Sequence, residues 1–367
     1  MKTILIFLAM VFFSQNATPQ SDAVMKFIFV PHPRSEDAQN LTVLPSIEKI
    51  DYSKFQMILL GGDLSWYTSI NRKAMDYCDS LFNLGSPKTL WTIGNHDISN
   101  PGLISEYTGR PRFYSYYSDS ITFLVLDTEM YFNGSHSTFI SGSQFEMIRN
   151  VADTIEISNY LVVLHHRLLW MIGNSDFSSL IPLVGQSTHQ LDTTNFYQEV
   201  YPLLKKVKDK GIGVICLGGD KSKINIEYSP EANITFLTST MAPEFPDSIN
   251  CVLVLEYSKY DREISWDFVN LDAIEKIEFN PVPDKPSNSG TVDLRVWQTR
   301  EVSISCEIKS GSDKNAMLSI YSIRGELVYC KNVATNREVD FSVRQKGFYL
   351  VQAKSGSENV IKRIIVN

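Results

Sequence analysis

Two short polar runs, each directly behind an apolar stretch of strand length, most constrain how this chain can fold. Gly-Gly-Asp at 61–63 follows the mostly apolar stretch 55–60, and Gly-Asn-His-Asp at 94–97 follows the stretch 89–93. Apolar runs of this length are typical of buried strands, and glycine allows the sharp turn that ends them. We therefore expect both polar runs at the C-terminal edge of a sheet, with Asp63 at its mouth.

A third apolar stretch, 160–164, also ends in polar side chains. It is followed by His165, His166 and Arg167. The chain has six histidines, and four of them directly follow strand-like segments: His32, His96, His165 and His166. Imidazole, amide and carboxylate groups at one sheet edge are ligands for hard or borderline cations, so the pattern predicts a metal site.

These blocks resemble the calcineurin-like metallophosphoesterase superfamily over roughly residues 24–272. The family carries Asp-x-His, Gly-Asp, Gly-Asn-His-Asp/Glu, a lone histidine after a strand, and Gly-His-x-His. An aromatic run at 113–117 and an apolar run at 123–127 agree with the family as well. The resemblance implies an α/β fold, a four-layer α/β/β/α sandwich, and hydrolysis of a phosphate ester by a metal-activated water.

Three metal-ligand positions depart from the family pattern, and Arg167 stands where the lone-histidine block commonly has a proline. Val30 stands where Asp-x-His has its carboxylate, and Asp220 and Ser222 stand in the two histidine positions of Gly-His-x-His. An aspartate is still an acceptable oxygen ligand. The ligands that the resemblance then implies for the second metal ion are Asp63, Asn95, His165 and Asp220.

The first metal ion would keep only His32 and Asp63, unless Asp37 or Glu36 reaches in from the following loop. The resemblance thus implies a degenerate first metal position and one or two divalent ions. Mixed oxygen and nitrogen ligands suit manganese, iron or zinc.

The resemblance makes His96 the proton donor to the leaving group, with Asp97 orienting the ring and favouring its protonated form. His166 and Arg167 are expected to line the cleft and contact the substrate, a phosphorylated small molecule or another phosphoester. Two hypotheses follow from the departures. One is a metal-dependent phosphoesterase, and the other is a catalytically silent surface protein that keeps the fold to bind a ligand.

The beginning of the chain predicts export. A lysine, an apolar stretch at 4–13 and a polar stretch at 14–21 are typical of a signal peptide, here 1–21. No other segment approaches the roughly 18 uninterrupted apolar residues of a membrane span, so we expect none in the mature protein. The net charge of −7 provides no basic surface, and a nucleic-acid partner is not expected.

A proline-rich segment at 273–290 predicts a linker. Beyond it, at 291–367, short alternating runs separated by turn residues predict an antiparallel β-sandwich. These runs are 291–296, 302–308, 317–323, 338–343, 348–353 and 360–366. Five cysteines leave at least one unpaired, and Cys306 and Cys330 in this domain could form a bridge.

This tail resembles the type A C-terminal sorting domain of the type IX secretion system of Bacteroidota. The matching segments are Asn-Pro at 280–281, 320–328, 346–349 and the closing 361–366. The resemblance implies the type IX secretion machinery as a partner and a secreted or cell-surface location. A generic carbohydrate- or protein-binding sandwich is the rival interpretation of the same strands.

Overall fold

The computed structural model describes most of the chain between residues 24 and 366. The described ranges are 24–37, 39, 41–132, 135–136, 138–185, 193–274, 293–300, 303–310, 315–322, 327–343, 346–355 and 358–366. The predicted signal peptide and residues 275–290 of the predicted linker lie outside them. In the described part of the chain, no helix has both the length and the apolar character needed to cross a membrane.

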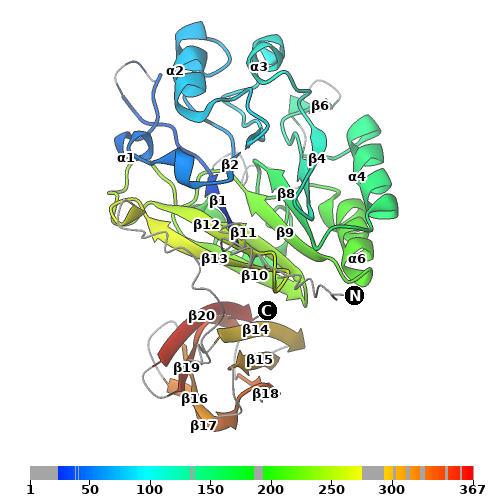
Figure 1. Cartoon of the computed structure of the whole chain (residues 1–367), viewed down its shortest axis with the longest axis vertical. Coiled ribbons are helices and arrows are strands. Elements are labelled where there is room, and N and C mark those ends of the chain that lie inside the picture. Colours follow the sequence, from blue (N-terminus) through cyan, green and yellow to red (C-terminus); the bar gives the residue numbers. More distant parts are fainter. Residues whose placement is uncertain are drawn as a thin grey trace, which may run out of the picture.

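One sheet carries the two polar runs at a common edge. Its strand order is β13-β12-β1-β2-β3 (Figure 1). The bounds are β1 Val24–Val30, β2 Met57–Leu60, β3 Thr89–Trp91, β12 Cys251–Ser258 and β13 Glu263–Asn270. Because β1, β2 and β3 are parallel, the loops that follow them meet at the same edge of the sheet.

A second sheet faces the first and has the order β10-β11-β9-β8-β5-β4. The bounds are β4 Tyr114–Ser118, β5 Ile121–Val125, β8 Tyr160–His165, β9 Gly213–Gly218, β10 Ile226–Glu231 and β11 Ile234–Thr238. Strands β5, β8, β9 and β11 are parallel, so their C-terminal ends also share one edge. A separate hairpin joins β6 Tyr131–Phe132 to β7 Ser135–His136.

Helices cover the outer face of each sheet. On the first sheet these are α1 Pro45–Glu48, α2 Arg72–Phe82 and α3 Pro101–Thr108, and on the second α4 Gly142–Thr154 and α6 Tyr201–Asp209. The short turns are η1 Tyr52–Lys54, η2 Ser175–Phe177, η3 Ile181–Leu183 and the π-turn η4 Phe196–Val200. The predicted four-layer α/β/β/α sandwich is confirmed (Figure 1).

Helix α2 shows how the sequence forms these outer layers. The Asn71 side chain accepts the backbone N–H of Lys73 at the start, and Asn83 ends the helix in a left-handed conformation. Met75, Cys78 and Phe82, at helical spacing, are buried against the first sheet. The helix therefore has a defined start, a defined end and one buried face.

Alternate side chains of the central strands enter different cores. In β1, Phe27 and Phe29 lie in the cluster between the sheets, whereas Ile28 and Val30 lie in the cluster under the helices of the first sheet. Residues 27–30 of β1 are all apolar because both faces of the strand are buried there. The sequence therefore predicts the strand, but it does not predict which side chains face the other sheet and which face the helices.

Two glycines let the edges of the two sheets touch. A Cβ atom on Gly219, just after β9, would lie 1.9 Å from the carbonyl oxygen of Gly61, just after β2. A Cβ atom on Gly61 would lie 2.4 Å from the carbonyl oxygen of Pro31. Any side chain at these positions would push the loops apart, so the close approach of the sheets requires glycine.

The C-terminal residues form an antiparallel β-sandwich, as predicted. Sheets β14-β15-β18 and β17-β16-β19-β20 enclose a separate apolar core. The bounds are β14 Asp293–Arg300, β15 Ser303–Lys309, β16 Asn315–Ser322, β17 Leu327–Ala334, β18 Glu338–Ser342, β19 Gly347–Ser355 and β20 Glu358–Val366. Strand β17 was not among the runs predicted from the sequence. Cys306 and Cys330 lie in different sheets, and none of the five cysteines, all within the described residues, forms a disulfide.

The C-terminal sandwich packs at the end of the first domain that lies away from the polar loops. Strands β14 and β20 contact β10 (Figure 1). Glu263 pairs with Arg295 at 2.5 Å and with Lys309 at 3.6 Å. Glu263 is next to the beginning of β1 through the register of β12 and β13. The loop that carries His32 follows the other end of β1, so the C-terminal sandwich leaves that edge uncovered.

We expect Gly219→Ala to lower the free energy of unfolding by roughly 3 kcal/mol, because the added methyl group meets backbone atoms that cannot rotate away. Gly102→Ala is the matched control. Its Cβ would meet only the Asn100 side chain at 3.4 Å within α3, so we expect unchanged or slightly higher stability. Denaturant titration of both variants measures the difference, and equal stabilities would contradict the proposed contact.

Candidate functional site around Asp63

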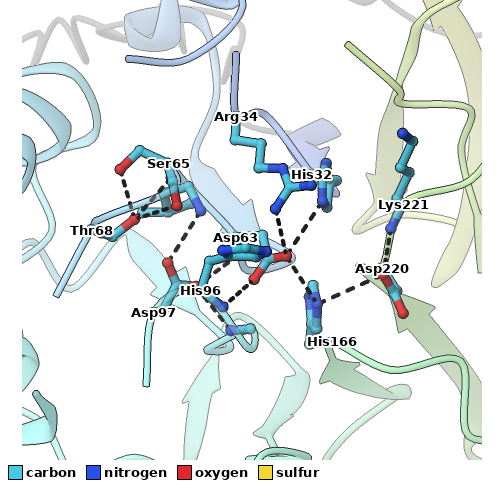
Figure 2. A network of polar contacts seen from close by, with 12 residues as sticks. His32, Arg34, Asp63, Ser65, Thr68, His96, Asp97, His166, Asp220 and Lys221 are labelled. Carbon is cyan, nitrogen blue, oxygen red and sulfur yellow. Dashed lines mark hydrogen bonds and ion pairs between the residues drawn. The ribbon is translucent and has the colours of Figure 1, made fainter. Parts of the chain in front are cut away.

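Asp63 lies at the meeting point of the two sheets. It follows β2 in a left-handed conformation with φ of 49°, and it is 2% exposed. Its Oδ1 atom accepts the backbone N–H of His96 at 2.9 Å (Figure 2). Burial by itself would raise the pKa of this carboxyl group, but the charge of His166 and the hydrogen bond from His32 hold the pKa well below its usual range.

Three nitrogen groups surround the other oxygen of Asp63. The Nε2 atom of His32 lies 3.4 Å from Oδ2, the Nε2 atom of His166 lies 3.6 Å away, and the Nη1 atom of Arg34 lies 3.7 Å away (Figure 2). The Nε2 atom of His166 also lies 3.9 Å from Oδ1 of Asp220. We call Asp63, His32, Arg34, His166 and Asp220 the Asp63 centre.

Among the histidines near Asp63, His166 is the one whose protonated form is favoured by its surroundings. Burial lowers its pKa, but the carboxylates of Asp63, Asp220 and Glu129 together raise it above the ordinary value. The pKa of His32 is instead lowered, chiefly by burial. The charge opposite Asp63 therefore comes from His166 and Arg34 more than from His32.

The structure exchanges the predicted positions of His165 and His166. Leu161 and Val163 of β8 face the helix side, and His165 continues that face with its ring 5.1 Å from the Trp170 ring. Its Nδ1 bonds to the carbonyl oxygen of Arg167 at 2.7 Å, and no ion pair within 4 Å joins it to Asp63 in the described residues. His166, predicted to contact substrate, is the residue that faces Asp63.

Asp97 is hydrogen-bonded to the backbone of two loops. Its carboxylate accepts the backbone N–H groups of Asp63 at 2.6 Å, Leu64 at 3.2 Å and Gly94 at 2.8 Å. Burial and the nearby charge of Asp63 raise its pKa to about 7. Asp97 therefore ties together the two loops that follow β2 and β3. That it also orients the ring of His96 stays a prediction.

His96 packs against an indole ring. Its ring lies 4.4 Å from the Trp66 ring at an interplanar angle of 81°. Burial lowers the pKa of His96 to about 4, although Asp63 opposes the shift. The expected protonated imidazole is thus not favoured at neutral pH, and His96 can donate or accept one hydrogen bond there.

Arg167, the other predicted substrate contact, is held in a buried ion pair. Its Nη2 atom donates to Oε2 of Glu129 at 2.6 Å, and both side chains are almost completely inaccessible. Burial raises the pKa of Glu129 to about 7 against the influence of Arg167. The guanidinium of Arg167 is therefore paired within the protein, and its contact with a substrate stays a prediction.

The other predicted ligands are placed separately. Asn95 is half-buried in the turn between Gly94 and His96, and Ser222 donates to the carbonyl oxygen of Ile224. Asp37 accepts hydrogen bonds from Ser35 and Thr42 in its own loop. Glu36 is exposed, so neither acidic residue that could have replaced the missing carboxylate reaches Asp63.

These residues do not fit the two-ion centre of the resembled family. Val30 is fully buried in the core under the helices, where it offers no ligand atom. Within the described residues, no group of three or more His, Cys, Asp or Glu side chains is placed to hold a metal ion. The guanidinium of Arg34 lies instead beside Asp63, and a permanent cation there opposes the binding of a second one.

Sequence reasoning missed Arg34 and Trp66. The guanidinium carbon of Arg34 lies 3.8 Å from the centre of the Trp66 ring, as in a cation–π contact. Arg34 follows His32 by two positions on the same loop, and Trp66 follows Asp63 by three. Their closeness in sequence to the predicted ligands His32 and Asp63 was a signal that could have found them. It did not show that the two loops meet in the fold.

Two family models match the chain. Residues 32–257 match the calcineurin-like phosphoesterase model, and residues 299–367 match the secretion system C-terminal sorting domain model. No curated protein matches the sequence.

Solved structures are only distantly similar. Vps29 from Chaetomium thermophilum is 11% identical with a TM-score of 0.27, covering 87% of this chain and 100% of its own. Dimeric latent PorU from Porphyromonas gingivalis is 16% identical with a TM-score of 0.20, covering 40% of this chain and 15% of its own. Neither similarity carries an argument about function.

We expect Asp97→Ala to lower the free energy of unfolding by roughly 3 kcal/mol or more, because three buried N–H groups lose their acceptor. Asp97→Asn keeps one acceptor oxygen and should fall in between. Asp209→Ala, at a position 65% exposed, is the control and should change stability by less than about 0.5 kcal/mol. Chemical denaturation checks the series, and an unaffected Asp97→Ala variant would refute the structural role.

Proposed function

Since this chain belongs to the calcineurin-like phosphoesterase family, we propose that it binds a phosphate ester or a similar anion at the Asp63 centre without the two-ion hydrolysis of that family. It is the second of the two hypotheses that the sequence left open. The scaffold alone cannot decide between them, because one fold can carry active and inactive sites.

One observation carries the proposal: Arg34 lies beside Asp63, the carboxylate that a metal ion would need as a ligand. Two-ion catalysis depends on paired cations that bind the phosphoryl oxygens and activate a water. Here the first position lacks its carboxylate at Val30, and Arg34 lies 3.7 Å from Oδ2 of Asp63. Cationic and hydrogen-bond-donating side chains remain, and these groups bind anions without any metal ion.

The location of the protein agrees with a surface binding function. The C-terminal sorting domain indicates export by the type IX secretion system and a secreted or cell-surface location. We propose the division already expected from the sequence, with residues 273–290 linking a phosphoesterase-like domain at 24–272 to the sorting domain at 291–367. Because the sorting domain contacts the far end of the sheets, it does not cover the edge that carries the Asp63 centre.

Metal content and turnover of the full chain test the proposal. After equilibration with manganese, iron or zinc and removal of loosely bound ions, we expect well below one ion per chain by elemental mass spectrometry. We also expect no metal-dependent hydrolysis of p-nitrophenyl phosphate above that of an Asp63→Asn variant. Two tightly held ions per chain, or hydrolysis that Asp63→Asn abolishes, would overturn the proposal.

A second candidate function is hydrolysis with one ion at the second metal position. It is favoured by His166, whose buried Nε2 atom has no hydrogen-bond partner in the described residues and points between Asp63 and Asp220. Asn95 lies on the loop that donates a backbone N–H to Asp63. Manganese, iron or zinc would suit these donors, provided that the side chains closed around the ion.

The two neighbouring histidines separate this candidate from the leading proposal. If an ion binds there, His166→Ala should weaken manganese affinity by more than roughly 100-fold, beyond the usual cost of losing an outer partner of a ligand. His165→Ala should leave the affinity nearly unchanged, because His165 faces Trp170. Isothermal titration with manganese measures both, and equal effects of the two substitutions would eliminate this candidate.

A further inference from the structure

Arg34 is a buried cation whose hydrogen-bonding capacity is mostly unused. The residue is only 8% exposed, yet within the described chain its Nε and Nη1 atoms have no hydrogen-bond partner. Its only ion pair there is the 3.7 Å approach to Asp63, which is longer than a hydrogen bond. Buried N–H groups are almost always paired in proteins, so an unpaired guanidinium points to a partner that the polypeptide does not supply.

The Trp66 ring holds the guanidinium of Arg34 in position. Its planar group lies 3.8 Å from the centre of the Trp66 ring, and the His96 ring meets the same indole at 4.4 Å. Stacking of this kind holds the plane of an arginine without using its N–H groups. Arg34 is therefore held in one orientation while its donors remain available.

Asp63 attracts the guanidinium of Arg34 but does not accept a hydrogen bond from its Nε or Nη1 atom. The Oδ1 atom of Asp63 is already used by the backbone N–H of His96, and Oδ2 faces His32 and His166 as well as Arg34 (Figure 2). A carboxylate shared in this way keeps the guanidinium at the centre but provides it with no paired, fork-like contact. Such a contact requires two oxygens on one atom, as in a phosphate or carboxylate group.

We infer that Arg34, stacked on Trp66, is the principal anion-binding group of the Asp63 centre and binds two oxygens of a phosphoryl group where a metal ion would otherwise act. The inference rests on the proposed function, namely metal-independent binding of a phosphate-type anion at this centre. It adds the residue responsible and the ligand class, a tetrahedral oxyanion such as a phosphate monoester. His96 is half-buried and packs against the same indole, so we expect it near the group that carries the phosphate.

Binding of inorganic phosphate to the full chain in the presence of EDTA tests the inference. Isothermal titration gives the affinity, and tryptophan fluorescence gives a second signal because Trp66 contacts Arg34. We expect Arg34→Gln to weaken binding by roughly 10- to 100-fold, the range that corresponds to losing hydrogen bonds from a charged donor. Arg34→Lys keeps the charge but loses the planar fork, so its affinity should fall between those of the wild type and Arg34→Gln.

Arg72→Gln is the matched control. Arg72 is an exposed arginine of α2 that pairs with Glu106 and also lies over an aromatic ring, that of Tyr107. Its substitution should leave phosphate affinity unchanged. Thermal unfolding of each variant shows whether it is folded, and if Arg34→Gln is not, Arg34→Lys decides the question by itself.

The outcomes distinguish the inference from the function on which it rests. Phosphate binding in EDTA that survives both Arg34 substitutions would overturn the role of Arg34 and leave metal-independent binding standing. An absence of phosphate binding by the wild-type chain in EDTA would overturn both. Binding that falls in the two Arg34 variants and persists in Arg72→Gln supports the inference.

Discussion

The contact between Gly61 and Gly219 is the constraint on which the site depends. Each glycine ends a central strand of a different sheet, and neither position has room for a Cβ atom. The absence of side chains brings the two loop edges together, so Asp63 from one sheet comes within 4 Å of His166 from the other. A wider separation would leave each carboxylate and imidazole buried without its partner, at considerable cost in stability.

The buried charge of Asp63 is stabilised by the protein itself. In a two-ion phosphoesterase, such a carboxylate is neutralised by exchangeable cations. Here a guanidinium and an imidazole with a raised pKa take over part of that task. The charge of Asp63 is therefore paired within the protein, and this pairing is the basis on which we propose that the centre holds an anion.

The Gly-Asn-His-Asp run illustrates how one motif serves two separate purposes. Asp97 accepts three backbone N–H groups and joins the loops after β2 and β3, which is a requirement of the fold. His96 lies against Trp66 and remains near the possible ligand position, which is a matter of function. The motif therefore has a structural role through Asp97 that does not depend on catalysis.

The sequence by itself determined the strands and loops that carry the site and the C-terminal β-sandwich, and its resemblance to a known family implied the four layers. Apolar runs, alternating runs and glycine turns are local signals, and the chain shows them clearly. Only the tertiary structure decided that His166 rather than His165 faces Asp63, because both faces of β8 are buried and apolar. Likewise, only the folded chain brings Arg34 onto Trp66 from a different loop. Contacts between distant segments depend on how the sheets pack, and a local pattern does not contain that information.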